Sequence, residues 1–165
     1  MRRIILYGAV LLFGCNEMTE KKADSLSEKE ITIADIKFSD LQNKPVLLAD
    51  QKGKIVFINF WATWCKPCVE EMPSIQRAME ILKNENAEFF FASDEESEQI
   101  EQFNEQHKFP FRFVRAENFL QYGIIGLPTT FIFNAEGKLV FSEMGYRRWD
   151  EETNIQLIKN FINQK

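Results

Sequence analysis

The hydrophobic pattern is strongest in the middle of the chain. The segment 55–61 (IVFINFW) is almost entirely apolar, which is typical of a strand buried on both faces. In the next segment, 66–84, apolar side chains recur at helical spacing: Met72, Ile75, Met79 and Leu82. We therefore predict a central strand that runs directly into an amphipathic helix.

Strands and helices alternate along the rest of the chain. Apolar runs predict strands over 88–92, 109–114, 129–134 and 139–144. Helical spacing predicts helices over 94–108 and 118–122 and from Asp150 onward. Turn residues at 40–45 divide two short apolar segments, so residues 36–48 are predicted to form a hairpin. This order predicts an α/β fold with a mixed central β-sheet and helices on both faces.

Two cysteines, Cys65 and Cys68, lie where the central strand is predicted to end and the helix to begin. Unpaired N–H groups and the helix dipole favour an anion there, so we expect the Cys65 thiol to have a pKa below the free value of about 8.5. Lys66 adds a positive charge, and Pro67 suits the first helical turn. Cys68, one turn further on, is placed to attack a mixed disulfide on Cys65. The predicted chemistry is reversible dithiol–disulfide exchange, with Cys65 as nucleophile and Cys68 as resolving thiol.

Two other interpretations of the C-x-x-C pair are weaker. Half of a zinc site would need further ligands, but the chain has no second C-x-x-C and its single His is His107, so we expect no metal. An inert structural disulfide with so short a loop would constrain the unfolded chain little.

The N-terminus has the pattern of an export signal. Arg2 and Arg3 precede an apolar stretch over residues 4–13. A stretch of about ten residues is too short for an ordinary transmembrane helix. A short basic region followed by such a stretch is typical of a signal peptide.

The segment 12–15 (LFGC) resembles a bacterial lipoprotein processing box, although Phe differs from the usual residue at the second position. This resemblance implies that residues 1–14 are a lipoprotein signal peptide and that Cys15 becomes the lipidated N-terminus. An uncleaved signal anchor and ordinary secretion are the alternatives. The polar segment 15–30 is expected to be a flexible tether, and 31–165 the folded domain.

Composition and charge narrow the function classes. The 165 residues include 20 Lys and Arg against 25 Asp and Glu, giving a formal net charge of -5. This balance argues against nucleic-acid binding, which normally needs a basic surface. The 16 Phe residues suit one domain with an aromatic core, and 3 Cys are too few for a disulfide-rich scaffold.

The motif Phe60-Trp61-x-x-Trp64-Cys65-x-Pro67-Cys68 resembles the active-site motif of thioredoxin-fold proteins. The longer run over 59–73 is similar to the membrane-tethered, extracytoplasmic thiol–disulfide oxidoreductases of bacteria of the TlpA/ResA type. The resemblance extends over residues 36–163. It implies a thioredoxin fold with an N-terminal β-hairpin extension and a central helix–strand insertion.

A second motif, Gly126-Leu127-Pro128-Thr129, resembles the cis-proline loop that faces the C-x-x-C pair in thioredoxin-fold proteins. The resemblance implies a cis Leu127–Pro128 bond, with the backbone of Leu127 free to pair with a substrate chain. The substrate-binding residues expected on this basis are Trp64, Lys66, Pro67, Leu127 and Pro128.

Glu71 matches an active-site Glu of the TlpA/ResA branch. A carboxylate near both thiols would raise their pKa and move protons during exchange. The alternative is a solvated acid near the helix start, stabilised by the helix dipole. Asn59 occupies the position where many thioredoxins have a buried Asp, and it cannot titrate. The segment 147–149 (RRW) is assigned to surface and packing positions.

The resemblance implies an enzyme, an extracytoplasmic thiol–disulfide oxidoreductase that acts as a reductase, lipid-anchored in the cell envelope and facing the periplasm or extracytoplasmic space. We expect no cofactor beyond the Cys65–Cys68 disulfide. The expected partners are protein thiols and disulfides, with apocytochrome c as a candidate, and a membrane thiol-electron donor. We expect a monomer that binds no nucleic acid.

Other functions stay open at the level of sequence. A disulfide-donating oxidase or an isomerase would use the same motif, because direction depends on the reduction potential. A thiol peroxidase usually places Thr three residues before its reactive Cys, whereas Thr63 is two before Cys65. A non-catalytic lipid-anchored binding domain would typically lack one cysteine, and both are present.

Overall fold

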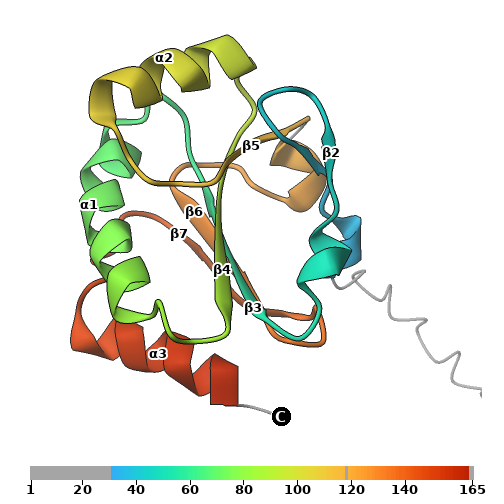
Figure 1. Cartoon of the computed structure of the whole chain (residues 1–165), viewed down its shortest axis with the longest axis vertical. Coiled ribbons are helices and arrows are strands. Elements are labelled where there is room, and N and C mark those ends of the chain that lie inside the picture. The colour runs from blue at the N-terminus through green and yellow to red at the C-terminus, as the bar shows by residue number, and fades with distance from the viewer. Residues whose placement is uncertain (1–30, 118, 164–165) are drawn as a thin grey trace, which may run out of the picture.

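A seven-stranded mixed sheet occupies the middle of the molecule (Figure 1). The computed structural model describes residues 31–117 and 119–163. The strands lie in the order β2-β1-β5-β4-β3-β6-β7. Their bounds are β1 (Phe38–Ser39), β2 (Pro45–Val46), β3 (Ile55–Phe60), β4 (Ala87–Ser93), β5 (Phe113–Ala116), β6 (Thr129–Phe133) and β7 (Leu139–Met144).

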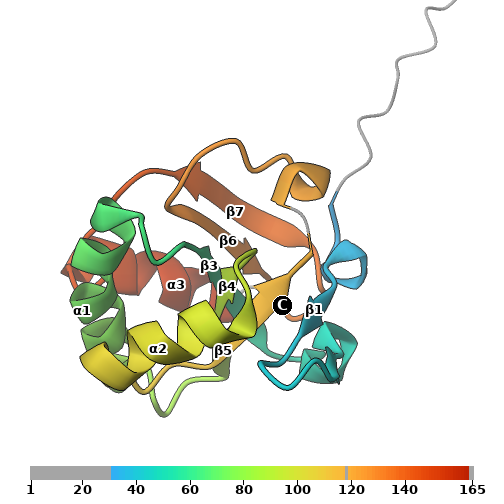
Figure 2. The ribbon, with the colours of Figure 1, turned by 90° about the horizontal axis from the view of Figure 1, so that it is seen from above.

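Helices cover both faces of the sheet, as Figure 2 shows from above. One face carries the α-helices of the described residues, which are α1 (Lys66–Ile81), α2 (Ser97–His107) and α3 (Glu152–Asn163). Short 3-10 helices cover the other face: η1 (Ile33–Asp35), η2 (Leu48–Gln51) and η3 (Phe119–Tyr122). The antiparallel β1–β2 hairpin and the α2–β5 insertion confirm the expected additions to the fold.

The central strand β3 contributes to both hydrophobic cores. Ile55 and Phe57 face the α-helices, whereas Val56, Ile58 and Phe60 face the 3-10 helices. Successive side chains of a strand point to opposite faces, so a strand covered on both faces is apolar at nearly every position. This explains the continuous hydrophobic run in the sequence. The exception in β3 is the buried Asn59, whose side chain donates to the Thr130 hydroxyl at 3.2 Å.

Strand pairing determines what lies beside the end of β3. The strand pairs in parallel with β4 and antiparallel with β6. In the antiparallel register Phe60 is opposite Thr129. Residues that follow β3 therefore lie next to residues that precede β6, which brings the C-x-x-C segment and Pro128 to one end of the sheet.

The strand predicted over 109–114 begins later than expected. β5 starts at Phe113, which is opposite Phe91 of β4. Pro110 has no N–H to donate to a ladder, which disfavours pairing before that point. The preceding rings stack instead: Phe111 lies 3.7 Å from Phe91 and 4.9 Å from Phe109, measured between ring centroids.

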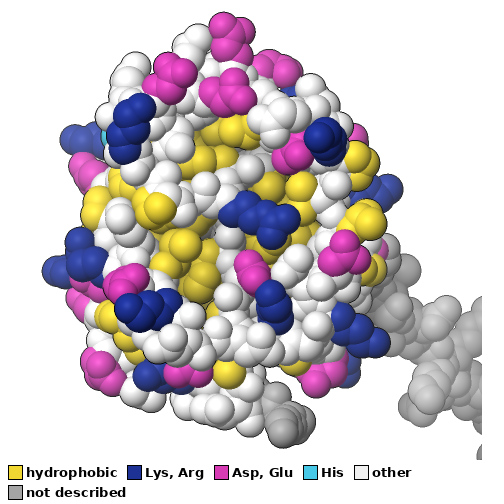
Figure 3. All heavy atoms as spheres, viewed as in Figure 1, with side chains coloured by type: hydrophobic (Ala, Val, Ile, Leu, Met, Phe, Trp, Pro, Cys, Tyr) yellow, Lys and Arg dark blue, Asp and Glu magenta, His cyan; other side chains and the backbone are white. Residues whose placement is uncertain are grey.

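Figure 3 shows positively and negatively charged side chains interspersed on this face of the molecule. Hydrophobic side chains are visible between α1 and the central strands. Among the described residues, no helix has the length and apolar character needed to cross a membrane. The predicted signal peptide, Cys15 and the tether lie outside the described residues.

Candidate active site

The two cysteines lie at the junction between β3 and α1. Cys65 is the N-cap residue of α1, and its backbone N–H donates to the Ala62 carbonyl at 3.1 Å. A disulfide joins Cys65 to Cys68, with the Cα atoms 5.3 Å apart. Exposure is 3% for Cys65 and 0% for Cys68. The predicted placement at a helix N-terminus is confirmed, and unpaired N–H groups there favour the thiolate form of a cysteine.

Exposed residues flank the buried cysteine pair on one side. Trp64 is 73% exposed, and Pro67 is exposed beside it. The Lys66 ammonium lies 3.7 Å from the Glu70 carboxylate, and the two side chains are 86% and 57% exposed. Water and the Glu70 charge both reduce the field of Lys66, so its influence on the thiols is weaker than the sequence suggested.

The Leu127–Pro128 peptide bond is cis, which confirms that prediction. Pro128 is buried, and Leu127 packs against the core that contains both cysteines. The Thr129 hydroxyl donates to the Gly126 carbonyl at 2.7 Å, and the Gly145 N–H donates to the Pro128 carbonyl at 2.7 Å. These bonds fix the proline loop to its own strand and to the segment after β7.

Glu71 lies on the buried side of α1. Its exposure is 0%, which excludes the alternative of a solvated acid. Burial penalises the charged form and raises the pKa of this carboxyl to about 8, although the Trp149 hydrogen bond and the Arg147 charge act in the opposite direction. A carboxyl that titrates near neutral pH, one helical turn from Cys68, is suited to proton transfer.

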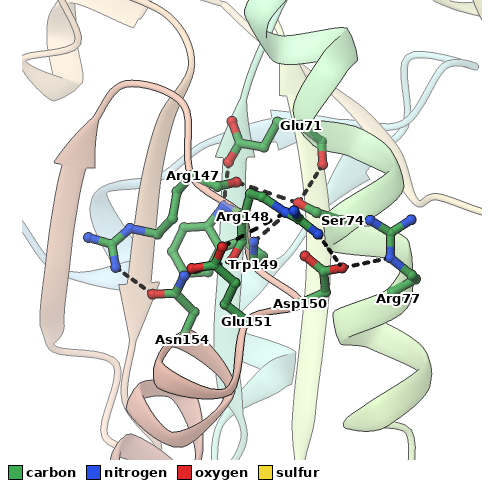
Figure 4. Close-up of polar contacts among 9 residues, drawn as sticks. All are labelled: Glu71, Ser74, Arg77, Arg147, Arg148, Trp149, Asp150, Glu151 and Asn154. Atoms are coloured by element: carbon green, nitrogen blue, oxygen red, sulfur yellow. Dashed lines mark hydrogen bonds and ion pairs between the residues drawn. The ribbon is translucent and has the colours of Figure 1, made fainter.

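The segment that follows β7 encloses this carboxyl (Figure 4). The Trp149 indole N–H donates to Glu71 Oε1, and Trp149 is only 1% exposed. Sequence reasoning assigned this Trp only to surface or packing. A buried indole does need a hydrogen-bond acceptor, but no spacing in the sequence pairs a Trp with an acid 78 positions earlier.

Glu95 is a second residue that sequence reasoning missed. Its carboxylate accepts the Thr63 backbone N–H at 2.7 Å and the Thr63 hydroxyl at 2.6 Å. It also accepts the Ser93 hydroxyl at 2.9 Å. Glu95 thus ties the end of β4 to the loop that leads into the cysteines, and it holds that loop in place.

Comparison with known proteins decides the family. The model of the AhpC/TSA family matches residues 30–142, which is more than half of the chain. The chain belongs to the AhpC/TSA family. Among relatives, the thiol-disulfide oxidoreductase ResA of Bacillus thuringiensis subsp. konkukian is 37% identical over 123 residues, covering 72% of this chain and 68% of the relative. The ResA of Geobacillus thermodenitrificans is 35% identical over 147 residues, covering 84% and 83%.

Solved structures agree with this assignment. A Chlorobium tepidum protein assigned as the thiol:disulfide interchange protein DsbE matches with a TM-score of 0.69 at 25% identity, over 82% of this chain and 99% of that one. A thiol:disulfide interchange protein from Bacteroides sp. matches with a TM-score of 0.65 at 26% identity, over 78% and 86%. This AhpC/TSA member thus has the predicted thioredoxin fold and is a thiol–disulfide oxidoreductase.

Proposed function

We propose that the protein is a lipid-anchored, extracytoplasmic thiol–disulfide reductase that uses Cys65 and Cys68. The Cys65 thiolate attacks a substrate disulfide, forming a mixed disulfide and releasing one substrate sulfur as a thiolate that takes up a proton. The Cys68 thiolate then attacks Cys65, which releases the second substrate thiol and leaves the Cys65–Cys68 disulfide. Two electrons pass from the enzyme dithiol to the substrate, and a membrane dithiol donor restores the enzyme.

One observation supports this proposal above the others: the cysteine pair lies at a helix N-terminus while a buried carboxyl, Glu71, lies one turn behind it. Burial disfavours the thiolate, and the neighbouring carboxyl opposes thiolate formation further when it is ionised, so both effects favour the disulfide form of the enzyme. Lys66 has the opposite tendency but is exposed and paired with Glu70. This balance favours a strongly reducing pair over an oxidant that delivers disulfides.

The proposed roles of the remaining site residues follow from their positions. Pro128 and Leu127 lie beside the cysteines, where the Leu127 backbone pairs with an extended substrate chain. Trp64, Lys66 and Pro67 form the exposed rim that contacts the substrate. The substrates are protein disulfides, with the disulfide of oxidised apocytochrome c as one candidate. The exchange needs no cofactor beyond the cysteine pair.

The activity is tested by insulin reduction with dithiothreitol, using the full-length protein in detergent. Wild type should accelerate insulin precipitation, and Cys65→Ser should not. Cys68→Ser should accumulate a mixed disulfide that a reductant releases. A wild-type protein that gives no acceleration, or that consumes hydrogen peroxide faster than it reduces insulin, contradicts the proposal.

The direction of electron transfer and the lipid anchor on Cys15 need separate measurements. Stoichiometric reduced protein should reduce a disulfide-bonded C-x-x-C-H peptide faster than oxidised protein oxidises the corresponding dithiol. Radiolabelled palmitate should label wild type and not Cys15→Ala in a bacterial host. If oxidation of the peptide is the faster reaction, the protein is an oxidant and not a reductase. If both proteins are labelled equally, Cys15 does not carry the lipid.

A further inference from the structure

Trp149 lies in the site although it is distant from the cysteines and Glu71 in sequence. It follows β7, yet its ring packs edge-on against Phe57 of the central strand, with centroids 4.8 Å apart. Phe141 of β7 contacts it from another side at 5.9 Å. The indole is therefore held in one orientation by aromatic neighbours, and its N–H points at the Glu71 carboxyl.

The two oxygens of this carboxyl have different surroundings. Oε1 accepts the Trp149 indole N–H. Oε2 is fully buried and has no hydrogen-bond partner within the part of the chain that the structure describes. A buried polar atom without a partner is costly, so such an atom in a native site usually has a functional reason.

The backbone around Trp149 is anchored to α1 and α3 (Figure 4). The Trp149 backbone N–H donates to the Ser74 hydroxyl at 3.1 Å, and that hydroxyl donates to the Glu71 carbonyl at 2.8 Å. Asp150 accepts from Arg77 of α1 at 2.7 Å. The Asn154 side chain of α3 donates to the Arg148 carbonyl at 2.7 Å.

The charged groups that face Glu71 come from the same region. Arg147 lies close enough to lower its pKa, and Glu143 of β7 raises it. These two side chains pair with each other, with Arg147 Nε 3.0 Å from Glu143 Oε1, so their effects on Glu71 largely offset. The charged side chains of Lys66, Glu70 and Arg77 on α1 are exposed, and Phe57 on β3 is apolar.

We propose that Trp149 is a positioning residue for the Glu71 carboxyl: its indole N–H holds Oε1 and leaves Oε2 as the oxygen that exchanges the proton with the cysteine pair. This inference rests on the proposed function. In the proton step, the ionised form of Glu71 takes up the proton of the Cys68 thiol at Oε2, which yields a thiolate and a neutral carboxyl. The carboxyl later returns that proton to the departing substrate thiolate, so protons balance over one turnover.

The first test follows Glu71 alone, in the oxidised protein, where the cysteines do not titrate. Carbon-13 NMR of the side-chain carboxyl reports its midpoint in wild type and in Trp149→Phe. Because the indole bond stabilises the carboxylate, its removal should raise the midpoint by about one pH unit. The control Phe141→Leu loosens the packing but keeps the indole N–H, and it should leave the midpoint within a few tenths of a unit. An unchanged or lower midpoint in Trp149→Phe overturns the proposal.

The second test uses wild type, so it does not depend on the folding of a variant. The chain has 3 Trp residues, and each gives one indole N–H signal in a nitrogen-15 spectrum. The Trp149 signal should shift with the midpoint of Glu71, and this shift should vanish in Glu71→Gln. The Trp61 indole is an internal control, because its buried N–H has no partner among the described residues. A Trp149 signal that does not follow Glu71 overturns the proposal.

The third test connects positioning to chemistry. The pH midpoint for alkylation of Cys65 in the reduced protein should fall in Trp149→Phe, because a carboxyl that stays neutral repels the thiolate less. In the Glu71→Gln background the same substitution should have no further effect. Additive shifts would show that Trp149 acts on the thiol without Glu71. Failure of wild type to reduce insulin would instead reject the proposed function, while the two NMR tests on oxidised protein would still stand.

Discussion

Glu70 and Glu71 are adjacent in sequence but belong to two different regions of the site. Glu70 lies on the solvent side of α1, where its side chain is 57% exposed and pairs loosely with Lys66. Glu71 is 0% exposed and receives a hydrogen bond from Trp149. One residue of difference on a helix turns the side chain by about 100°, which here separates the rim of the active site from the core.

The comparison shows how the surroundings of a carboxyl decide its chemistry. A surface pair such as Lys66–Glu70 contributes only about 0.2–1 kcal/mol, because water screens it. Burial raises the pKa of Glu71 to about 8, so this carboxyl holds or releases a proton near neutral pH. In our proposal the exposed residues beside the cysteine pair contact the substrate, and the buried Glu71 carboxyl accepts and returns the proton.

The largest expected effect comes from the cysteines, which join the two sides. Cys65→Ser should lower insulin reduction by at least about 1000-fold, because the serine hydroxyl is not ionised at neutral pH and does not form a mixed disulfide. Cys68→Ser should also abolish turnover but still form the mixed disulfide, which mass spectrometry would detect. Equal trapping by both variants would contradict the assigned order of attack.

Glu71→Gln tests the buried side. The folded protein binds the Glu71 proton up to about pH 8, whereas an ordinary Glu releases it near 4.5. The stability from the neutral carboxyl is therefore fully present below pH 4.5 and is lost as pH rises to 8. Oxidised wild type should lose about 3–5 kcal/mol of unfolding free energy between pH 5 and 9 relative to Glu71→Gln.

Urea unfolding at a series of pH values measures this difference. Glu70→Gln is the matched control, and it should keep the pH dependence of wild type. Parallel stability curves for wild type and Glu71→Gln would show that Glu71 does not titrate as proposed.

Glu95→Gln tests the hydrogen bonds that hold the loop before the cysteines. The substitution weakens two charge-assisted bonds to Thr63 and should destabilise the protein by about 1–3 kcal/mol. Glu96→Gln is the control, since the Glu96 side chain is 75% exposed, pairs with Arg115 at 2.9 Å and otherwise caps α2, which the amide oxygen of Gln can still do. Thermal unfolding measures both variants, and the effect of Glu96→Gln should stay below about 1 kcal/mol. Equal losses of unfolding free energy in the two variants would show that the Glu95 hydrogen bonds do not stabilise the loop.

Lys66→Gln should have the smallest effect. Its unfolding free energy should change by less than about 1 kcal/mol, because the side chain is 86% exposed. The alkylation midpoint of Cys65 should move less than it does in Glu71→Gln. A larger shift in Lys66→Gln would mean that the exposed side, and not the buried carboxyl, controls the thiols.

Local patterns predicted most of the fold and part of the site. The continuous apolar run of β3 requires burial on both faces, and the C-x-x-C spacing at its end places Cys65 at the N-cap of α1. The cis bond before Pro128 was predicted from the motif resemblance, because the residue types alone favour a trans bond. The segment 109–112 was wrongly included in a strand, since apolar rings that stack look like apolar residues of a strand.

The partners of the buried groups did not follow from the sequence. Trp149 meets Glu71, and Glu95 meets Thr63, only after the sheet brings distant segments together. Neither contact has a periodicity or spacing that a sequence reveals. Such tertiary hydrogen bonds require the register of the strands and the path of the segment after β7.

The reduction potential of the Cys65–Cys68 pair tests the central claim most directly. Full-length protein would be equilibrated in thiol redox buffers at pH 7, and the fraction oxidised measured by alkylation. We predict a value near or below that of thioredoxin, about −270 mV, as expected for a reductase supplied by a membrane donor. A value near that of DsbA, about −120 mV, would identify an oxidant and contradict the proposal.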